Sequence, residues 1–212
     1  MIKITNLTKK FGDQVVLDNI NLNIESGDKV LIMGQNGAGK TTLMKAILAQ
    51  IVCQSGEVLI GGINPVKHRK KALKFLSFVP QTPPPLRLSV AEICDYAVRT
   101  DGVFLGDVER YLKEFDLDYE REKNKPFHKL SGGMKQKVLI AIALARNSQI
   151  IMFDEPTANL DPEAREKFLS LLRADFADKT LVFISHRVSE VEGLVTRTVE
   201  MDLGKIAKEG KA

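Results

Sequence analysis

Hydrophobic residues occur along this chain in several short, nearly continuous runs. Such runs are typical of strands in a parallel sheet, because helices cover both faces of these strands. The runs that predict buried strands are Val30–Met33, Phe75–Val79, Ile150–Phe153 and Thr180–Ile184. After Asp161 the pattern continues in the order helix, strand, helix, strand. We therefore predict an α/β fold with a mostly parallel core sheet.

The first thirty residues have a different pattern, in which hydrophobic and polar positions alternate. Ile20, Leu22 and Ile24 lie two residues apart, which is the spacing of side chains on one face of a strand. Turn-forming residues stand at Gly12-Asp13 and at Ser26-Gly27-Asp28. These features predict an antiparallel β-subdomain over about residues 1–30.

Helical patterns dominate the segment from about residue 87 to about residue 130. Ser89-Val-Ala-Glu92 has the sequence of a capping box, which begins a helix. Val108, Tyr111, Leu112 and Phe115 are spaced as on one face of a helix. We predict a helical subdomain here, inserted in the core of a single domain that spans residues 1–212.

Three further helices are predicted next to the segments that carry the candidate chemistry. One runs from Thr41 to Ala49. Another runs from Gly132 to Arg146, with Ser131 as its N-cap and with the apolar residues Val138, Leu139, Ile142 and Ala145 at helical spacing. The third has Asp161 as its N-cap and Pro162 at its first position.

The segment from Gly34 to Thr41 has the form G-x-x-x-x-G-K-[ST], which is that of a phosphate loop. It follows an apolar run and precedes a predicted helix, as the motif requires. Glycines let backbone N–H groups approach a polyphosphate, and the helix N-terminus adds further donors. The Lys40 ammonium would reach the β- and γ-phosphates, and the Thr41 hydroxyl would reach Mg2+.

Two acidic residues, Asp154 and Glu155, end the apolar run Ile150–Phe153. The carboxyl end of a parallel strand faces the crevice where ligands bind in open α/β sheets. Beside a phosphate loop, Asp154 would hold the coordination sphere of Mg2+ and Glu155 would act as general base for the attacking water. Without that loop, the pair would have an alternative interpretation as polar residues that meet solvent.

The segment Leu130-Ser-Gly-Gly-Met134 resembles the signature motif of ABC-type ATPases. Gln81, Asp154-Glu155, Asn159-Leu-Asp161 and His186 follow the order found in ABC nucleotide-binding domains, so the resemblance covers nearly the whole chain. It implies an ABC-type phosphate-loop fold and an ATPase that converts ATP and water to ADP and phosphate.

The resemblance also implies a site that two copies of the chain complete together. Ser131, Gly132, Gly133 and Asp161 would contact the nucleotide or the partner copy in a head-to-tail dimer. Within one copy, the contacts to ATP would come from the phosphate loop and the residues next to it. The matching residues are Gly34, Asn36, Gly37, Ala38, Gly39, Lys40, Thr41 and Thr42.

Three single residues match the family by position. Phe11 matches the aromatic residue that stacks on adenine, although it could instead anchor the first sheet. Gln81 matches the glutamine that contacts Mg2+ and the attacking water, so the metal ligands would be Thr41, Gln81 and Asp154. His186 matches the histidine that contacts the γ-phosphate, and the catalytic set would be Lys40, Gln81, Glu155 and His186.

The resemblance implies a chain that powers membrane transport by docking on separately encoded polytopic membrane subunits, at the cytoplasmic face of the inner membrane. Met134, where glutamine is more usual in the family, resembles the variant found in the ATPases of export systems. Pro83-Pro84-Pro85 would stiffen the loop expected to touch the membrane subunit. The alternative is a soluble ABC ATPase that acts on ribosomes or DNA. The DNA-acting type needs a long coiled coil, for which the segment between Gln81 and Leu130 is too short, and the ribosome-acting type carries two such domains, whereas this chain has one phosphate loop. A small phosphate-loop kinase would leave the signature motif unexplained.

Composition adds limits to this interpretation. The 31 Lys and Arg residues and 27 Asp and Glu residues give a net charge of +4, and no aromatic residues alternate with the basic stretch Lys67–Lys71. We therefore expect a solvated face there and no nucleic-acid partner. His68 and His128 are expected to face solvent. Cys53 and Cys94 have no C-x-x-C spacing, so we expect neither a disulfide framework nor a zinc site. We also expect neither an export signal nor a membrane-spanning segment.

Overall fold

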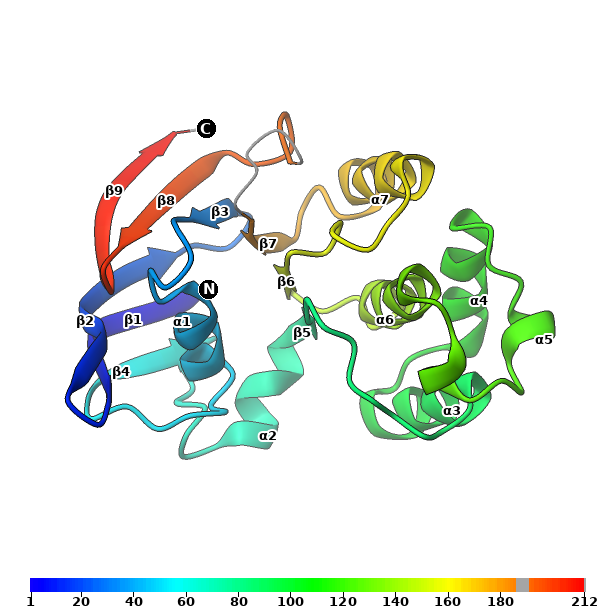
Figure 1. The fold of residues 1–212 in the computed structure, drawn as a ribbon, viewed down its shortest axis with the longest axis horizontal. Coiled ribbons are helices and arrows are strands. Elements are labelled where there is room, and N and C mark those ends of the chain that lie inside the picture. The colour runs from blue at the N-terminus through cyan, green and yellow to red at the C-terminus, as the bar shows by residue number, and fades with distance from the viewer. Residues whose placement is uncertain (186–190, 212) are drawn as a thin grey trace. The chain divides into compact units, whose positions relative to one another are not determined.

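The computed structural model describes residues 1–185 and 191–211, which form two compact units (Figure 1). The first unit contains residues 1–76 and the chain from residue 178 onwards, and the second contains residues 77–177.

The first unit begins with an antiparallel sheet of three strands, in the order β2-β1-β4. The strands are β1 (Ile2–Phe11), β2 (Gln14–Ile24) and β4 (Ser55–Ile60). Ile2 is opposite Ile24 on one side and opposite Ile60 on the other, and all three side chains are buried. The antiparallel subdomain predicted from the alternating pattern is confirmed, and β4 joins it from beyond the predicted range.

A second sheet in this unit places β3 (Lys29–Met33) between β7 (Thr180–Ile184) and β8 (Arg197–Asp202). β3 is parallel to both neighbours, and β9 (Lys205–Lys211) pairs antiparallel with β8. Nearly every side chain of β3 and β7 is buried, which explains why their sequences are continuous apolar runs. The mostly parallel sheet is thus confirmed.

The C-terminal part differs from the predicted order in one respect. We expected a helix between β7 and β8, but the described residues 191–196 form turns, and residues 186–190 lie outside the described part of the chain. The antiparallel hairpin of β8 and β9 was not predicted. It turns at Leu203-Gly204, where both residues have positive φ.

The helices of the first unit are short. Helix α1 (Lys40–Ile47) follows the phosphate loop and ends two residues before the predicted end, because Ala49 has a positive φ of 49°. Helix α2 (Arg69–Ala72) carries the basic stretch, whose side chains are exposed, as expected for a solvated face. A 3-10 turn over Leu73–Phe75 follows it, so the predicted strand begins at Leu76 instead of Phe75.

The second unit combines strands β5 (Leu76–Val79) and β6 (Ile150–Asp154) with a group of helices. Helices α3 (Val90–Asp101), α4 (Leu105–Glu114) and α6 (Gly132–Ala145) pack on one another, with the short α5 (Tyr119–Glu122) and a 3-10 turn over Phe127–Lys129 between α4 and α6. Helix α7 (Pro162–Asp175) packs on β6 through an edge-to-face contact between Phe168 and Phe153, with ring centroids 5.2 Å apart.

Local sequence signals explain how these helices begin. Ser89 and Glu92 form the predicted capping box, in which each side chain bonds the backbone N–H of the other residue. Ser131 caps α6 through the N–H of Met134, and Asp161 caps α7 through the N–H of Ala164.

Burial of the helices follows the predicted faces only in part. Val108, Tyr111, Leu112 and Phe115 are all buried, which confirms the predicted face of α4. Helix α6 is buried on more than one face: Ile140, Ala141 and Leu144 are buried, whereas Leu139 and Ile142 are partly exposed. Val138 and Ala145 are buried as well, so the apolar spacing predicted the helix correctly but did not separate its buried from its exposed residues, because the helix is apolar nearly all round.

Candidate functional site

The phosphate loop of the first unit joins β3 to α1 and is closely surrounded by backbone. A Cβ atom at Gly34 would lie 2.2 Å from the carbonyl oxygen of Met201, and one at Gly39 would lie 2.7 Å from that of Val16. Both glycines have positive φ, of 150° and 102°. The loop can therefore pass its neighbours only with glycine at these two positions.

Lys40 lies inside this loop. Its Nζ atom donates hydrogen bonds to the carbonyl oxygens of Gly34, at 2.6 Å, and of Gln35, at 3.0 Å. The side chain is buried, and the first turn of α1 has no acidic residue. The helix N-terminus and the ammonium thus form a positive site that no carboxylate of this turn neutralises.

The other predicted loop residues differ in exposure. Asn36, Gly37 and Thr41 are exposed, Thr42 is partly exposed, and Ala38 is buried. Ala38 is fixed by its backbone, because its carbonyl oxygen accepts a hydrogen bond from the N–H of Gly204 at 3.2 Å. The hairpin of β8 and β9 is thereby bonded to the backbone of the phosphate loop, a contact that the sequence did not indicate.

Phe11 ends β1, and half of its surface is exposed. Lys9 Nζ stands 4.7 Å from the centroid of its ring and also donates to the carbonyl oxygen of Val52 at 2.7 Å. A ring that anchored the sheet would be buried, so the exposure argues against that alternative. The cation on one face of the ring was not foreseen from the sequence.

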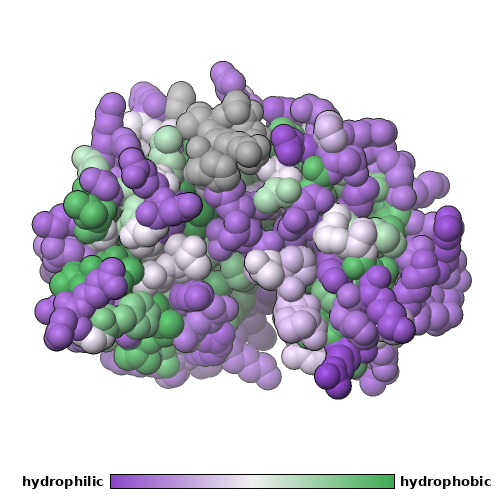
Figure 2. Space-filling view, in the orientation of Figure 1, coloured by the Kyte–Doolittle hydropathy of each residue, from purple (hydrophilic) through white to green (hydrophobic). Residues whose placement is uncertain are grey.

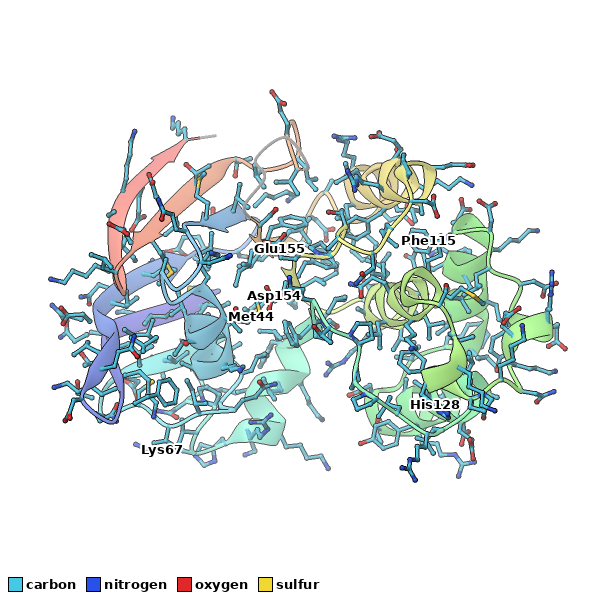
Figure 3. The ribbon with its side chains drawn as sticks, in the orientation of Figure 1. Met44, Lys67, Phe115, His128, Asp154 and Glu155 are labelled. Carbon is cyan, nitrogen blue, oxygen red and sulfur yellow. The ribbon has the colours of Figure 1, made fainter. Side chains whose placement is uncertain are left out.

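Asp154 and Glu155 lie at the carboxyl end of β6 in the second unit (Figure 3). They are 7% and 8% exposed, which excludes the interpretation that they merely meet solvent. Glu155 has a φ of 46°, an uncommon conformation for a residue with a side chain. Such backbone strain is typical of functional positions, where the surrounding structure maintains it.

The signature segment of the second unit lies against the segment that contains Asn159. A Cβ atom at Gly133 would lie 2.9 Å from the carbonyl oxygen of Asn159, so glycine permits this approach. Asn159 Nδ2 also donates to the carbonyl oxygen of Gln81 at 3.4 Å. The structure therefore brings together Gln81, the signature glycines and the Asn159–Asp161 segment.

Asp161 has two partners in the second unit. Its carboxylate accepts from the N–H of Ala164 at 2.8 Å and lies 3.3 Å from Nζ of Lys137 on α6. The Ala164 N–H, and next to it the Lys137 ammonium, lower the pKa of this carboxyl group below its ordinary value. Lys137 was not among the predicted site residues, although its place on the signature helix could have indicated it.

His186 lies outside the described residues. His68 and His128 are exposed, as expected, and both cysteines are free thiols. Phosphate-loop residues belong to the first unit, whereas Gln81, the signature, Asp154, Glu155 and Asp161 belong to the second.

The phosphate loop and the signature helix occur in one chain, and comparison with known proteins agrees with both. Residues 17–158 match the family described as ABC transporter. The chain belongs to the ABC transporter family.

A curated relative is the glutamine transport ATP-binding protein GlnQ of Escherichia coli, which is 32% identical over 226 residues; the match covers 99% of this chain and 91% of GlnQ. Among solved structures, the dimeric ATP-binding cassette MJ0796, in a post-hydrolysis state bound to ADP and Pi, is 31% identical with a TM-score of 0.86. That match covers 100% of this chain and 98% of the cassette.

A bacterial Atm1-family ABC exporter with ATP bound is also similar, with 26% identity and a TM-score of 0.87; the match covers 99% of this chain and 38% of the exporter. This member of the ABC transporter family therefore has the cassette fold, and it is an ATPase subunit that binds and hydrolyses ATP. None of the described helices is both long and apolar enough to cross a bilayer.

Proposed function

We propose that this ATPase drives transport as a head-to-tail dimer of two copies, docked on separately encoded polytopic membrane subunits. The observation that carries this proposal is the presence of two helix N-termini suited to anions in one chain. Helix α1 follows the phosphate loop, and helix α6 begins at the signature with Ser131 exposed and no acidic residue in its first turn. One nucleotide between two copies would contact the N-terminus of α1 from one copy and the N-terminus of α6 from the other.

In this arrangement the phosphate loop binds ATP and Lys40 neutralises the β- and γ-phosphates. The exposed amide of Asn36, the backbone of Gly37–Gly39 and the hydroxyl of Thr42 complete the cradle, and the exposed face of Phe11 stacks on adenine. Ser131, Gly132 and Gly133 of the second copy approach the γ-phosphate. Asp161 contributes to the interface between copies.

Glu155 acts as the general base, because a buried carboxylate next to the attacking water can accept its proton as the bond to phosphorus forms. Gln81 and His186 orient that water and contact the γ-phosphate. The backbone conformation of Glu155 supports this role, since residues held in uncommon conformations cluster at functional sites.

The proposed metal ligands suit Mg2+. Thr41, Gln81 and Asp154 offer hydroxyl, amide and carboxylate oxygens, which are the hard donors that this ion prefers. The described residues contain no group of three or more His, Cys, Asp or Glu side chains able to hold a metal. A nucleotide site needs no such group, because Mg2+ keeps several waters and binds phosphate oxygens. The ion would neutralise charge on the transferred phosphoryl group.

The surface proposed for the membrane subunit lies in the second unit. Its large exposed hydrophobic side chains are Leu88, Tyr96 and Phe104, with exposed fractions of 44%, 64% and 71%. All three lie in the stretch that begins just after Pro83-Pro84-Pro85 and ends before α4, whereas the visible surface of α4 and α5 is mostly hydrophilic (Figure 2). We propose that these exposed apolar side chains contact the membrane subunit.

We propose export as the direction of transport and the cytoplasmic face of the membrane as the location. Met134 in the signature and the similarity to an Atm1-family exporter support export, although GlnQ carries the description of a glutamine transport protein. None of the relatives named above is described as acting on ribosomes or DNA, so that alternative has no support from them.

Co-purification of the tagged chain from native membranes tests the proposal. A polytopic membrane protein should accompany it in stoichiometric amount, and Tyr96→Lys should release that protein while ATP binding persists. Lys113→Ala, a substitution on the hydrophilic helix α4, is the matched control and should retain the partner. Recovery of ribosomes or DNA in place of a membrane protein would refute the transport role.

A further inference from the structure

Gln136 is a completely buried amide on the signature helix α6, with an exposed fraction of 0%. Its Nε2 atom donates to the carbonyl oxygen of Pro80 at 3.4 Å. Its Oε1 atom is buried and has no hydrogen-bond partner among the described residues. A carbonyl can only accept, so this contact fixes which end of the amide faces Pro80.

Burying a polar group costs free energy unless the group is hydrogen-bonded. An apolar side chain of similar length would fill the same space without an unsatisfied acceptor, but it would also remove the donor that satisfies the Pro80 carbonyl oxygen. The bond to Pro80 is therefore the feature that distinguishes Gln136 from a core-filling residue. Pro80 directly precedes Gln81, so the amide holds the start of the loop that carries Gln81.

Lys137, the next residue of the helix, reaches a second segment. Its Nζ atom lies 3.3 Å from Oδ2 of Asp161, and only 15% of the lysine side chain is exposed. Consecutive residues of a helix point about 100° apart, so Gln136 and Lys137 can contact two different segments from one turn of the helix.

Those two segments also contact each other. Asn159 donates to the carbonyl oxygen of Gln81 at 3.4 Å, and its own carbonyl oxygen lies where only glycine at position 133 fits. Within the second unit, a polar contact thus joins each pair among the signature helix, the Gln81 loop and the Asn159–Asp161 segment.

We propose that Gln136 and Lys137 are positioning residues, which keep the Gln81 loop and Asp161 in register with the signature. The inference rests on the roles proposed above for Gln81 and Asp161. A shift of the Gln81 loop, where the membrane subunit is expected to act, then moves the signature helix and Asp161 with it. Neither Gln136 nor Lys137 needs to touch the nucleotide.

The test compares Gln136→Met, Lys137→Met and the control Lys135→Met in the purified full chain. Lys135 lies on the same turn, and no hydrogen bond or ion pair of its side chain is among the described contacts. Gln136→Met should have nearly unchanged stability in urea, because loss of the bond to Pro80 is offset by removal of the unsatisfied Oε1 atom, and it should have normal ATP affinity. Its turnover should fall about 3- to 10-fold, as expected for one lost hydrogen bond, with KM unchanged.

Lys137→Met should slow turnover in the same way, and the double variant should be less affected than the product of the two single effects. Lys135→Met should behave as the unchanged chain. Normal turnover of Gln136→Met would overturn the inference, and so would a loss of turnover that accompanies lost stability.

Gln81→Ala and Asp161→Asn, measured in parallel, separate this inference from the proposed function. If both retain normal turnover, the roles proposed for these two residues fail. If both slow turnover while Gln136→Met and Lys137→Met do not, those roles stand and the positioning inference alone falls.

Discussion

The burial and backbone conformation of single residues in this ATPase depend on the surrounding structure more than on residue type. Glu155 is an acid that the sequence places after a strand, yet its burial and its positive φ come from the tertiary structure. Gly34 and Gly39 are required because backbone carbonyl oxygens from distant strands lie where a Cβ atom would stand.

Glu155→Gln should preserve ATP binding and lower turnover by about 10²–10⁴-fold, because the amide matches the shape of the carboxylate but cannot accept the proton. Steady-state phosphate release and equilibrium nucleotide binding measure the two effects. Turnover close to that of the unchanged chain would remove Glu155 from the chemical step.

Gly39→Ala should reduce the free energy of unfolding by about 1–3 kcal/mol more than Gly37→Ala, because the new Cβ would lie 2.7 Å from the Val16 carbonyl oxygen. Both positions have positive φ, and a Cβ at Gly37 meets nothing within 4 Å, so the second variant carries the backbone strain alone. Urea unfolding compares them. Equal destabilisation would show that the close approach has no cost.

Elements of this protein begin where short sequence signals predict, and their ends depend on packing. The caps Ser89, Ser131 and Asp161 are all confirmed, since a cap needs only its own side chain and the next three residues. The buried faces of α6 were not predictable, because surrounding elements decide which apolar residues are covered.

The cap of α7 should have a measurable titration. The pKa of Asp161 should lie below the ordinary value of about 3.9, because the Ala164 N–H and the Lys137 ammonium favour the charged form. This contribution to stability is fully present above the unfolded-state pKa and is lost as the pH falls through the lowered, folded-state pKa.

Carboxyl-resolved NMR titration measures this pKa directly. Lys137→Met should raise it only part of the way towards the ordinary value, because the bond from Ala164 is the larger cause. An ordinary pKa in the unchanged chain would show that the cap does not form in solution.

At the scale of the whole molecule, function depends on a second copy. The phosphate loop and the signature belong to different compact units of one chain, and we propose that each works with its counterpart in a partner copy. ATP would then act as an adhesive between two surfaces, and hydrolysis would release them.

Ser131→Arg should abolish the ATP-dependent dimer of Glu155→Gln while the monomer still binds ATP, because the exposed position would carry a bulky side chain into the interface. Size-exclusion chromatography with light scattering measures dimerisation. Ser131→Ala is the control: it removes the cap, at about 1 kcal/mol, without adding bulk. Loss of ATP binding by the Ser131→Arg monomer would contradict a site completed by a second copy.

The sequence by itself determined the fold class, the antiparallel start, the buried strands β3, β5, β6 and β7, the helix caps and the candidate site, because these depend on local periodicity and on contiguous motifs. The tertiary structure alone decided which distant groups meet: the Val16 and Met201 carbonyl oxygens against the phosphate loop, and Gln136 and Lys137 against Pro80 and Asp161. No local pattern encodes those contacts, because each joins residues whose separation along the chain is bridged only when strands and helices pack together.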